Sequence, residues 1–213
     1  MTLPKPRMRG RLHQIAFFVS VPAGIALIAV ASSRQARVGA AVFAVSLAGV
    51  FGASAAYHRV PWNDAARHRM KRLDHSMIFV LIAGTYTPVC LLGLGGGWAV
   101  VILATIWAGA VAGIVVKQVD VDGLSRLTGF LYIALGWAAV IVLPKLLHSV
   151  SPLTFALVIA GGLLYTLGAI VFATKRPDPN PAVFGYHEIW HAFTAGAGLC
   201  HYLAVLLLVL AVH

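Results

Sequence analysis

Residues 152–174 read PLTFALVIAGGLLYTLGAIVFAT, an apolar run without one charged side chain. About 20 apolar residues are enough to cross the hydrocarbon core of a bilayer as a helix. Helix is the form we expect, because lipid offers no hydrogen-bond partners to backbone N–H and C=O groups. This stretch predicts a membrane-spanning helix, and it decides which kind of fold the rest of the chain should have.

The rest of the 213-residue chain repeats this pattern. Hydrophobic residues make up 60% of the sequence and charged residues only 10%, whereas a soluble domain carries about 25% charged residues. Pro88 and Pro144 lie inside or at the ends of apolar runs, where kinks are tolerated. We therefore expect an all-α fold, with a single domain over residues 1–213 that forms a bundle of seven transmembrane helices. The predicted spans are 12–33, 38–60, 73–94, 97–117, 127–147, 152–174 and 187–211.

The basic residues are distributed unequally between the two ends of these spans. The amino-terminal segment and the loops after the second, fourth and sixth spans hold 13 of the 16 Lys and Arg residues, with Lys117 counted in a loop. Such an excess marks the cytoplasmic side, so we expect a cytoplasmic amino terminus and an outside carboxyl terminus. The net charge of +10 fits loops that face anionic lipid. No nucleic-acid-binding motif accompanies it, so we expect membrane lipids and no nucleic acid as partners.

Ionisable residues inside a membrane are costly and usually functional. With this topology, the end of the second span and the starts of the third and seventh spans bring His58, Asp74, His187 and His191 to one depth. His187 and His191 are four residues apart, so they share a helix face. Three histidine ligands with a fourth position open are typical of a catalytic zinc. We therefore predict that His58, His187 and His191 bind Zn²⁺.

Two further residues lie at this depth. Ser54 precedes His58 by one helical turn, so its hydroxyl points to the same face; it could instead bond back to its own helix. Asp74 has several possible roles: a fourth metal ligand, a partner that orients an imidazole, a base acting on a bound water, a helix cap, or an ion pair with Lys71 or Arg72. Ser54 and Asp74 are our candidate catalytic residues.

Residues 187–191 also match the short pattern H-E-x-x-H, whose Glu is the general base in soluble metalloproteases. Glu188 lies about 100° around the helix from His187, so we treat it as a secondary candidate. His201 lies about 21 Å deeper than His187 at 1.5 Å per residue, and we expect it to be a hydrogen-bonded core residue. We expect the remaining histidines near span ends to be interfacial or terminal: His13, His148 and His213.

Three segments resemble the signatures of the hemolysin III family, the bacterial branch of the progestin and adipoQ receptor superfamily. They are Ser54-x-x-x-His58, residues 73–88 (LDHSMIFVLIAGTYTP), and His187-x-x-x-His191. The resemblance covers essentially the whole chain. It implies a multi-pass protein of the bacterial cytoplasmic (inner) membrane, with zinc on His58, His187 and His191 and with Asp74 close to the metal-bound water.

The resemblance leaves three functions open. The superfamily includes alkaline ceramidases, which implies a zinc-dependent hydrolase of a lipid amide or ester in membrane-lipid homeostasis. A receptor-like sensor with structural zinc is the second reading. The third is a pore that causes cytolysis, although no polar stripe crosses a full span. The oligomeric state stays open.

Overall fold

The structure, a computed structural model, describes residues 6–212. Within them the chain is helical and forms no strand. Its elements are α1 (Arg11–Ala29), α2 (Arg34–Arg59), α3 (Asp64–Pro88), η1 (Val89–Leu94), α4 (Gly96–Val119), α5 (Ser125–Trp137), η2 (Ala138–Ile141), α6 (Leu143–Ser149), α7 (Pro152–Thr174) and α8 (Tyr186–Leu210). The predicted all-α membrane bundle is confirmed.

The fifth predicted span is not one continuous helix. Six helical segments in the described part of the chain are long and apolar enough to cross a membrane by themselves. Residues 127–147 instead divide into α5, η2 and α6, which bend by 53° at the break before Leu143. Pro144 lies at the start of α6, and its ring excludes the carbonyl four residues earlier while offering no N–H. Seven spans result only if this bent pair is counted as one.

Short polar residues begin several helices. The side chains of Ser33, Asn63 and Ser151 each accept a hydrogen bond from the backbone N–H three residues later, at 2.9–3.1 Å. A cap of this kind satisfies one of the N–H groups that a helix start leaves without a partner. The caps therefore mark the starts of α2, α3 and α7, which follow the preceding helices after only two to four residues.

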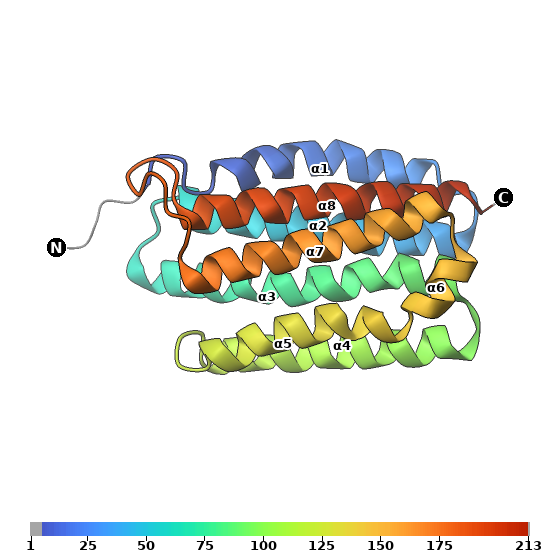
Figure 1. Cartoon of the computed structure of the whole chain (residues 1–213). Helices are drawn as coiled ribbons and strands as arrows, with labels where there is room; N and C mark the ends of the chain where they lie inside the picture. Colours follow the sequence, from blue (N-terminus) through green and yellow to red (C-terminus); the bar gives the residue numbers. More distant parts are fainter. Residues whose placement is uncertain (1–5, 213) are drawn as a thin grey trace.

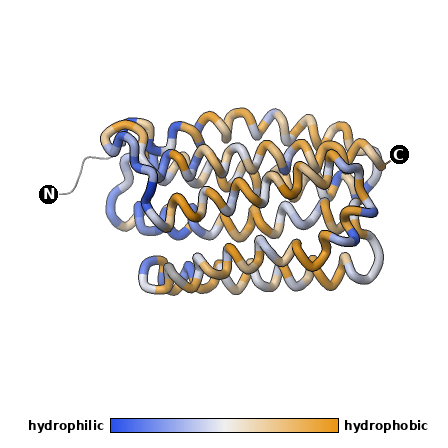
Figure 2. The backbone as a smooth tube through the Cα atoms, viewed as in Figure 1, coloured by the Kyte–Doolittle hydropathy of each residue, from blue (hydrophilic) through white to orange (hydrophobic). Residues whose placement is uncertain are grey.

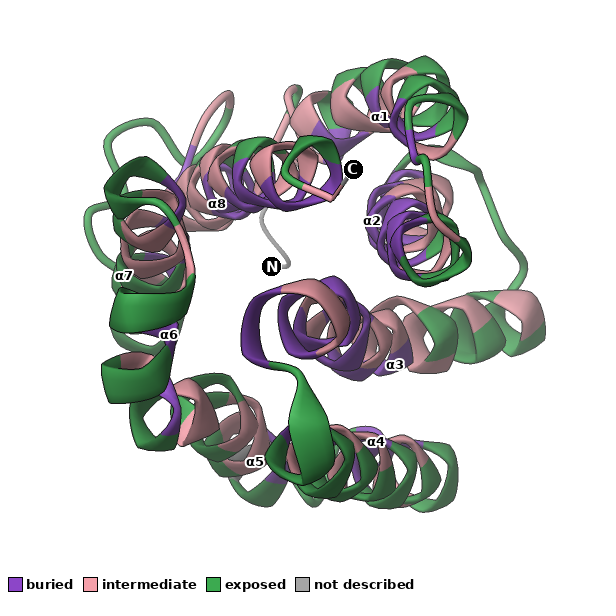
Figure 3. Cartoon of the chain, turned by 90° about the vertical axis from the view of Figure 1, so that its right-hand side faces the viewer, coloured by how far each residue is buried: buried purple, intermediate pink, exposed green. Residues whose placement is uncertain are grey.

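The helices are arranged around α3 (Figure 3). Along the bundle, α1, α2 and α3 follow one another as antiparallel neighbours, and α8 packs against α1, α2 and α7 (Figure 1). The hairpin of α4 and α5 covers the far side of α3. Apolar side chains fill the interior on both sides of α3, around Phe43 on one side and around Phe79 on the other. The topology thus joins the end of α2 to the start of α8 although more than a hundred residues separate them.

Hydrophilic residues gather at one end of the bundle (Figure 2). This end carries the start of α1 and the α2–α3, α4–α5 and α7–α8 loops, while the end of α8 lies at the opposite end (Figure 1). The segment before α1 is fastened to the α7–α8 loop, because the backbone N–H groups of Arg7 and Met8 donate to the carbonyls of Ala182 and Val183 at 3.1 Å. The loops that the charge count grouped together therefore share one end.

Candidate metal centre

Three histidines from two helices meet near the polar end of the bundle. His58 lies in the last turn of α2, and His187 and His191 lie in the first two turns of α8. Each offers one ligand nitrogen, and these nitrogens lie within 4.8 Å of one another. His58 and His191 are buried, and His187 is half-buried. The histidine pair on α8 and the third histidine on α2, which the sequence placed at one depth, therefore lie close together in the structure.

The spacing of the rings fits a shared cation. The Nε2 atoms of His58 and His187 are 3.2 Å apart, which suits either an N–H···N hydrogen bond or two ligands of one ion. Two nitrogens that bind one tetrahedral zinc at the usual bond length of about 2.0–2.1 Å lie about 3.3 Å apart. The Nδ1 atom of His191 is buried and has no hydrogen-bond partner among the residues that the structure describes. The donor set is therefore compatible with a three-histidine metal centre.

The segment before α1 presses directly on the end of α2. Gly10 has a positive φ of 78°, and a Cβ at this position would lie 2.6 Å from Cβ of His58. A residue with a side chain would be strained by the dihedral angle and would collide with the histidine. Gly10 therefore allows the chain to pass closely over His58 before α1 begins.

Glu188 fastens the same region, although it belongs to the H-E-x-x-H pattern. Its side chain is fully buried. Oε2 accepts a hydrogen bond of 2.9 Å from the backbone N–H of Gly185 at the start of α8, and Oε1 forms an ion pair with the guanidinium of Arg9. Both carboxylate oxygens are thus engaged in joining α8 to the amino-terminal segment.

His13 is part of this site, a role that its prediction as an interfacial or terminal residue did not anticipate. Its side chain is only 3% exposed. The ring stacks on that of His191 with centroids 3.8 Å apart, and its Nδ1 lies 2.8 Å from the Ser54 hydroxyl. The sequence contained a usable signal, because the first span also starts at the cytoplasmic side. The depth argument that selected His58 and His187 applies equally to His13.

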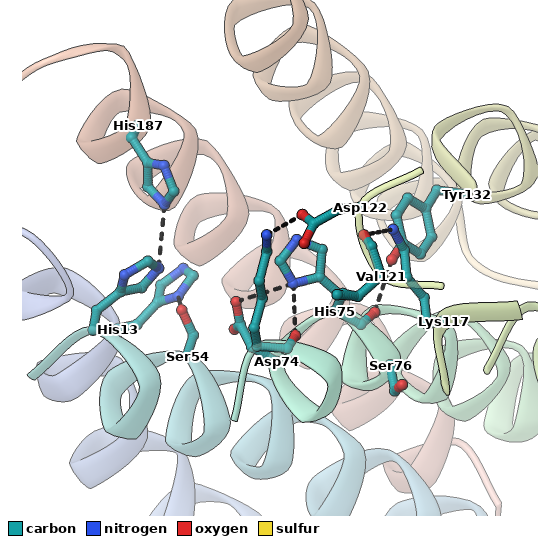
Figure 4. Close-up of polar contacts among 12 residues, drawn as sticks. His13, Ser54, Asp74, His75, Ser76, Lys117, Val121, Asp122, Tyr132 and His187 are labelled. Atoms are coloured by element: carbon teal, nitrogen blue, oxygen red, sulfur yellow. Dashed lines mark hydrogen bonds and ion pairs between the residues drawn. The ribbon is translucent and has the colours of Figure 1, made fainter. Parts of the chain in front are cut away.

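Asp74 joins this group from α3. Its carboxyl interacts with the Ser54 hydroxyl, and it lies 3.7 Å from Nδ1 of His75. That His75 nitrogen also lies 2.8 Å from the Lys71 carbonyl. Because a carbonyl only accepts hydrogen bonds, Nδ1 of His75 carries the proton. Asp74 lies between the histidines and a second polar cluster (Figure 4). Among the described residues, the group that could hold an ion consists of the three histidines and does not include Asp74.

The second polar cluster connects α3, α4 and α5 at the same end (Figure 4). The charge count assumed that Lys117 is a loop residue, which is wrong, because it lies in the last turn of α4. Its side chain is buried and donates a hydrogen bond of 3.2 Å to the Val121 carbonyl. Lys71 forms an ion pair with Asp122, and the nearby ammonium holds the pKa of the Asp122 carboxyl below its usual value. Tyr132 donates to the His75 carbonyl at 2.8 Å. These contacts hold the start of α3 in place.

A largely apolar cavity of about 230 Å³ lies deeper in the bundle. Its wall includes Ile78, one turn after Asp74, and Trp190 and Thr194, on either side of His191 in the sequence of α8. His201 lines the same cavity, is buried, and lies 3.3 Å through Nε2 from the Val158 carbonyl. The prediction that His201 is a hydrogen-bonded core residue apart from the metal ligands is confirmed.

Comparison with known proteins identifies the family. The family model described as "Haemolysin-III related" matches residues 1–202. The chain belongs to the haemolysin III family. Haemolysin III proteins form the bacterial branch of the progestin and adipoQ receptor superfamily, so the resemblance seen in the three segments is confirmed.

Two similar proteins come from Bacillus species. The "Hemolysin-3" of Bacillus cereus is 35% identical over 203 residues, which cover 93% of this chain and 89% of that protein. The "Hemolysin-3 homolog" of Bacillus subtilis (strain 168) is 32% identical over 197 residues, with 91% and 89% covered. The human "Monocyte to macrophage differentiation factor" is 26% identical over 173 residues, with 79% and 69% covered. The haemolysin III chain described here thus has relatives in bacteria and animals.

Proposed function

We propose that this haemolysin III protein is a zinc-dependent hydrolase of a membrane lipid amide or ester. The observation that carries the proposal is that His58, His187 and His191 lie close together. Beside them lie the Ser54 hydroxyl on α2 and the Asp74 carboxyl on α3, which interact with each other. Three protein ligands leave a fourth coordination position for water or substrate, as in catalytic zinc sites. A fully closed set of four ligands would have favoured a structural role.

The protein groups around the histidines can supply the remaining chemistry. Zinc held there would act as a Lewis acid and lower the pKa of water toward about 7. Asp74 would accept the proton of the attacking water, since it is the carboxyl that contacts Ser54 at the edge of the histidine group. Once Asp74 holds that proton, the Ser54 hydroxyl would no longer need to donate to it and would donate its hydrogen bond to the developing oxyanion. His13 would orient the Ser54 hydroxyl through its Nδ1 contact of 2.8 Å.

The apolar cavity supports a lipid as the substrate. Trp190 lies next to His191 in α8, and Ile78 lies one turn beyond Asp74 in α3, and both line the cavity. An apolar cavity of about 150 Å³ is already large enough to bind benzene, so a cavity of about 230 Å³ can take part of an acyl chain. The polar head with its amide or ester bond would then lie at the histidines.

The decisive experiment combines metal analysis with lipid hydrolysis. Purified protein should contain about one zinc per chain and release fatty acid from at least one member of a panel of ceramides, amides and esters. Asp74→Asn should retain the zinc and lower the hydrolysis rate by about 10²-fold or more, the usual scale for a lost general base. Full hydrolysis by Asp74→Asn would eliminate this mechanism, and zinc loss in the variant would make Asp74 a ligand.

Two other functions are outcomes of the same experiment. Zinc without hydrolysis of any lipid would favour a receptor-like sensor with structural zinc. Leakage of dye-loaded vesicles after addition of the protein would favour a cytolytic pore, which the name Hemolysin-3 suggests for the Bacillus cereus relative.

We further propose that the polar end of the bundle faces the cytoplasm of a bacterium and that the chain lies in the inner membrane. The basis is the excess of Lys and Arg in the loops at this end. A periplasmic reporter enzyme fused to the carboxyl end should be active, and the same reporter inserted in the loop before Asp64 should be inactive. Activity in the reverse pattern would contradict this orientation.

A further inference from the structure

Deeper in the bundle than the histidine cluster, two residues that line the cavity each carry a buried polar atom with no hydrogen-bond partner among the described residues. These are the hydroxyl of Tyr165 on α7 and Nδ1 of His201 on α8; both atoms are buried and neither has a hydrogen bond. Their rings are neighbours, with centroids 5.6 Å apart, and both residues line the apolar cavity. Leaving a buried polar group without a partner is destabilising, so these two atoms point to a bound group that pairs with them.

The other hydroxyl groups of the cavity wall, as far as the structure describes them, are already satisfied. Each donates to a backbone carbonyl at 2.8–3.0 Å: those of Thr85, Tyr86, Tyr132, Thr166 and Thr194. Tyr165 therefore stands apart from the other hydroxyl-bearing residues of the wall. This difference argues against a general looseness of polar packing in the bundle.

The hydrogen-bonding roles of the two atoms complement each other. Nε2 of His201 faces the Val158 carbonyl at 3.3 Å; a carbonyl only accepts, so Nε2 carries the proton and Nδ1 of the neutral ring is an acceptor. The Tyr165 hydroxyl can donate. A group that both accepts and donates, such as an alcohol, would satisfy both atoms, whereas a keto group would satisfy only Tyr165.

We propose that the cavity binds a lipid chain that carries a hydroxyl group, with Tyr165 and His201 as its recognition site. This inference rests on the proposed function only in taking the ligand to be a lipid whose head lies at the histidines. His201 follows His191 by ten residues, which corresponds to about 15 Å along the helix. An extended chain advances about 1.2 Å per bond, so the hydroxyl belongs about twelve bonds from the head group.

The test compares three fatty acids for binding to the purified protein in nanodiscs: octadecanoate, 2-hydroxyoctadecanoate and 12-hydroxyoctadecanoate. Displacement of a fluorescent fatty acid measures affinity without any turnover. We expect 12-hydroxyoctadecanoate to bind about tenfold more tightly than the other two, the effect of about 1.4 kcal/mol. Equal affinities, or a preference for the 2-hydroxy acid, would overturn the inference.

Two pairs of variants make the test specific. Tyr165→Phe should abolish the preference for the 12-hydroxy acid and leave octadecanoate binding unchanged. Tyr86→Phe is its matched control, since the Tyr86 hydroxyl lines the same cavity but is bonded to the carbonyls of Leu135 and Gly136; it should retain the preference. Loss of the preference in both, or in neither, would contradict the assignment.

The second pair acts through the backbone of α7. A Cβ at Gly161 would lie 2.3 Å from Nε2 of His201, whereas a Cβ at the adjacent Gly162 would meet nothing within 4 Å. Gly161→Ala should therefore displace the histidine and remove the preference, while Gly162→Ala should retain it. Because binding needs no hydrolysis, a protein that prefers the 12-hydroxy acid but cleaves no lipid would refute the hydrolase proposal alone.

Discussion

His191 and His201 lie on the same helix, and both are buried, yet their surroundings differ. His191 stacks on His13 and has two other imidazoles close by, those of His58 and His187. His201 faces a backbone carbonyl on one side and an otherwise apolar cavity on the other. The first environment gathers several ring nitrogens that can share a cation, and the second isolates one.

The difference comes from depth in the bundle. At the polar end, the start of α1, the end of α2 and the start of α8 all bring polar residues to one level. In the middle of the bundle, α8 meets mostly apolar side chains, and the ring of His201 fits only because Gly161 on α7 has no side chain. Histidines of one helix can therefore lie in a group that could hold a metal ion at one level and in a cavity wall ten residues further along.

The largest expected effect tests this contrast through metal content. His187→Ala should weaken zinc binding by at least about 10²-fold, because losing even an outer-shell partner of a metal ligand costs 10–100-fold. His201→Ala should retain the zinc of the wild-type protein. Elemental analysis after dialysis against a weak chelator measures both. Equal zinc in wild type and His187→Ala would refute the metal centre.

A smaller effect should appear at His13, which distinguishes the polar end from a simple three-histidine cluster. His13→Phe keeps an aromatic ring against His191 but removes the nitrogen that contacts Ser54. Hydrolysis should fall about tenfold, the value of one hydrogen bond of about 1.4 kcal/mol, with zinc unchanged.

The matched control for His13 is Ser54→Ala. If His13 acts through the Ser54 hydroxyl, the double variant should be no slower than the slower single variant. Additive losses would mean that His13 and Ser54 act independently.

Glu188 tests whether the H-E-x-x-H pattern is catalytic or structural. Glu188→Gln leaves an acceptor for the Gly185 N–H but removes the charge that pairs with Arg9. We expect a loss of about 1.5–3 kcal/mol of stability, the range for a hydrogen bond to a charged group, seen as a lower Tm, with hydrolysis and zinc retained. A 10²-fold loss of hydrolysis at unchanged Tm would instead make Glu188 the base.

The smallest effect should come from the exposed ion pair of Lys71 and Asp122. The Asp122 side chain is 66% exposed, so solvent screening should keep the loss in Asp122→Asn below about 1 kcal/mol. Lys71 lowers the pKa of Asp122 from its usual 3.8. The ion pair therefore contributes its full stabilisation of the fold above pH 3.8, and this stabilisation is lost as the pH falls through the lowered pKa of Asp122. A Tm difference between wild type and Asp122→Asn that grows on acidification would contradict this assignment.

Much of the architecture follows from the sequence. The lengths of the apolar runs, the absence of hydrogen-bond partners in lipid and the distribution of Lys and Arg predict helices, their alternation and the loops that share one end. The i, i+4 spacing of His187 and His191 places both on one helix face, which is a local property of any helix. His58 followed from topology, because alternating spans return to the same side of the membrane.

Other features depended on tertiary packing. Sequence spacing does not show whether Pro144 kinks a helix or ends it, because the answer depends on what the neighbouring helices leave room for. The stacking of His13 on His191 requires α1 to lie against α8, and the pairing of Tyr165 with His201 requires α7 to lie beside it. Such contacts join residues far apart in the chain, and their geometry is set by side-chain packing rather than by any local period.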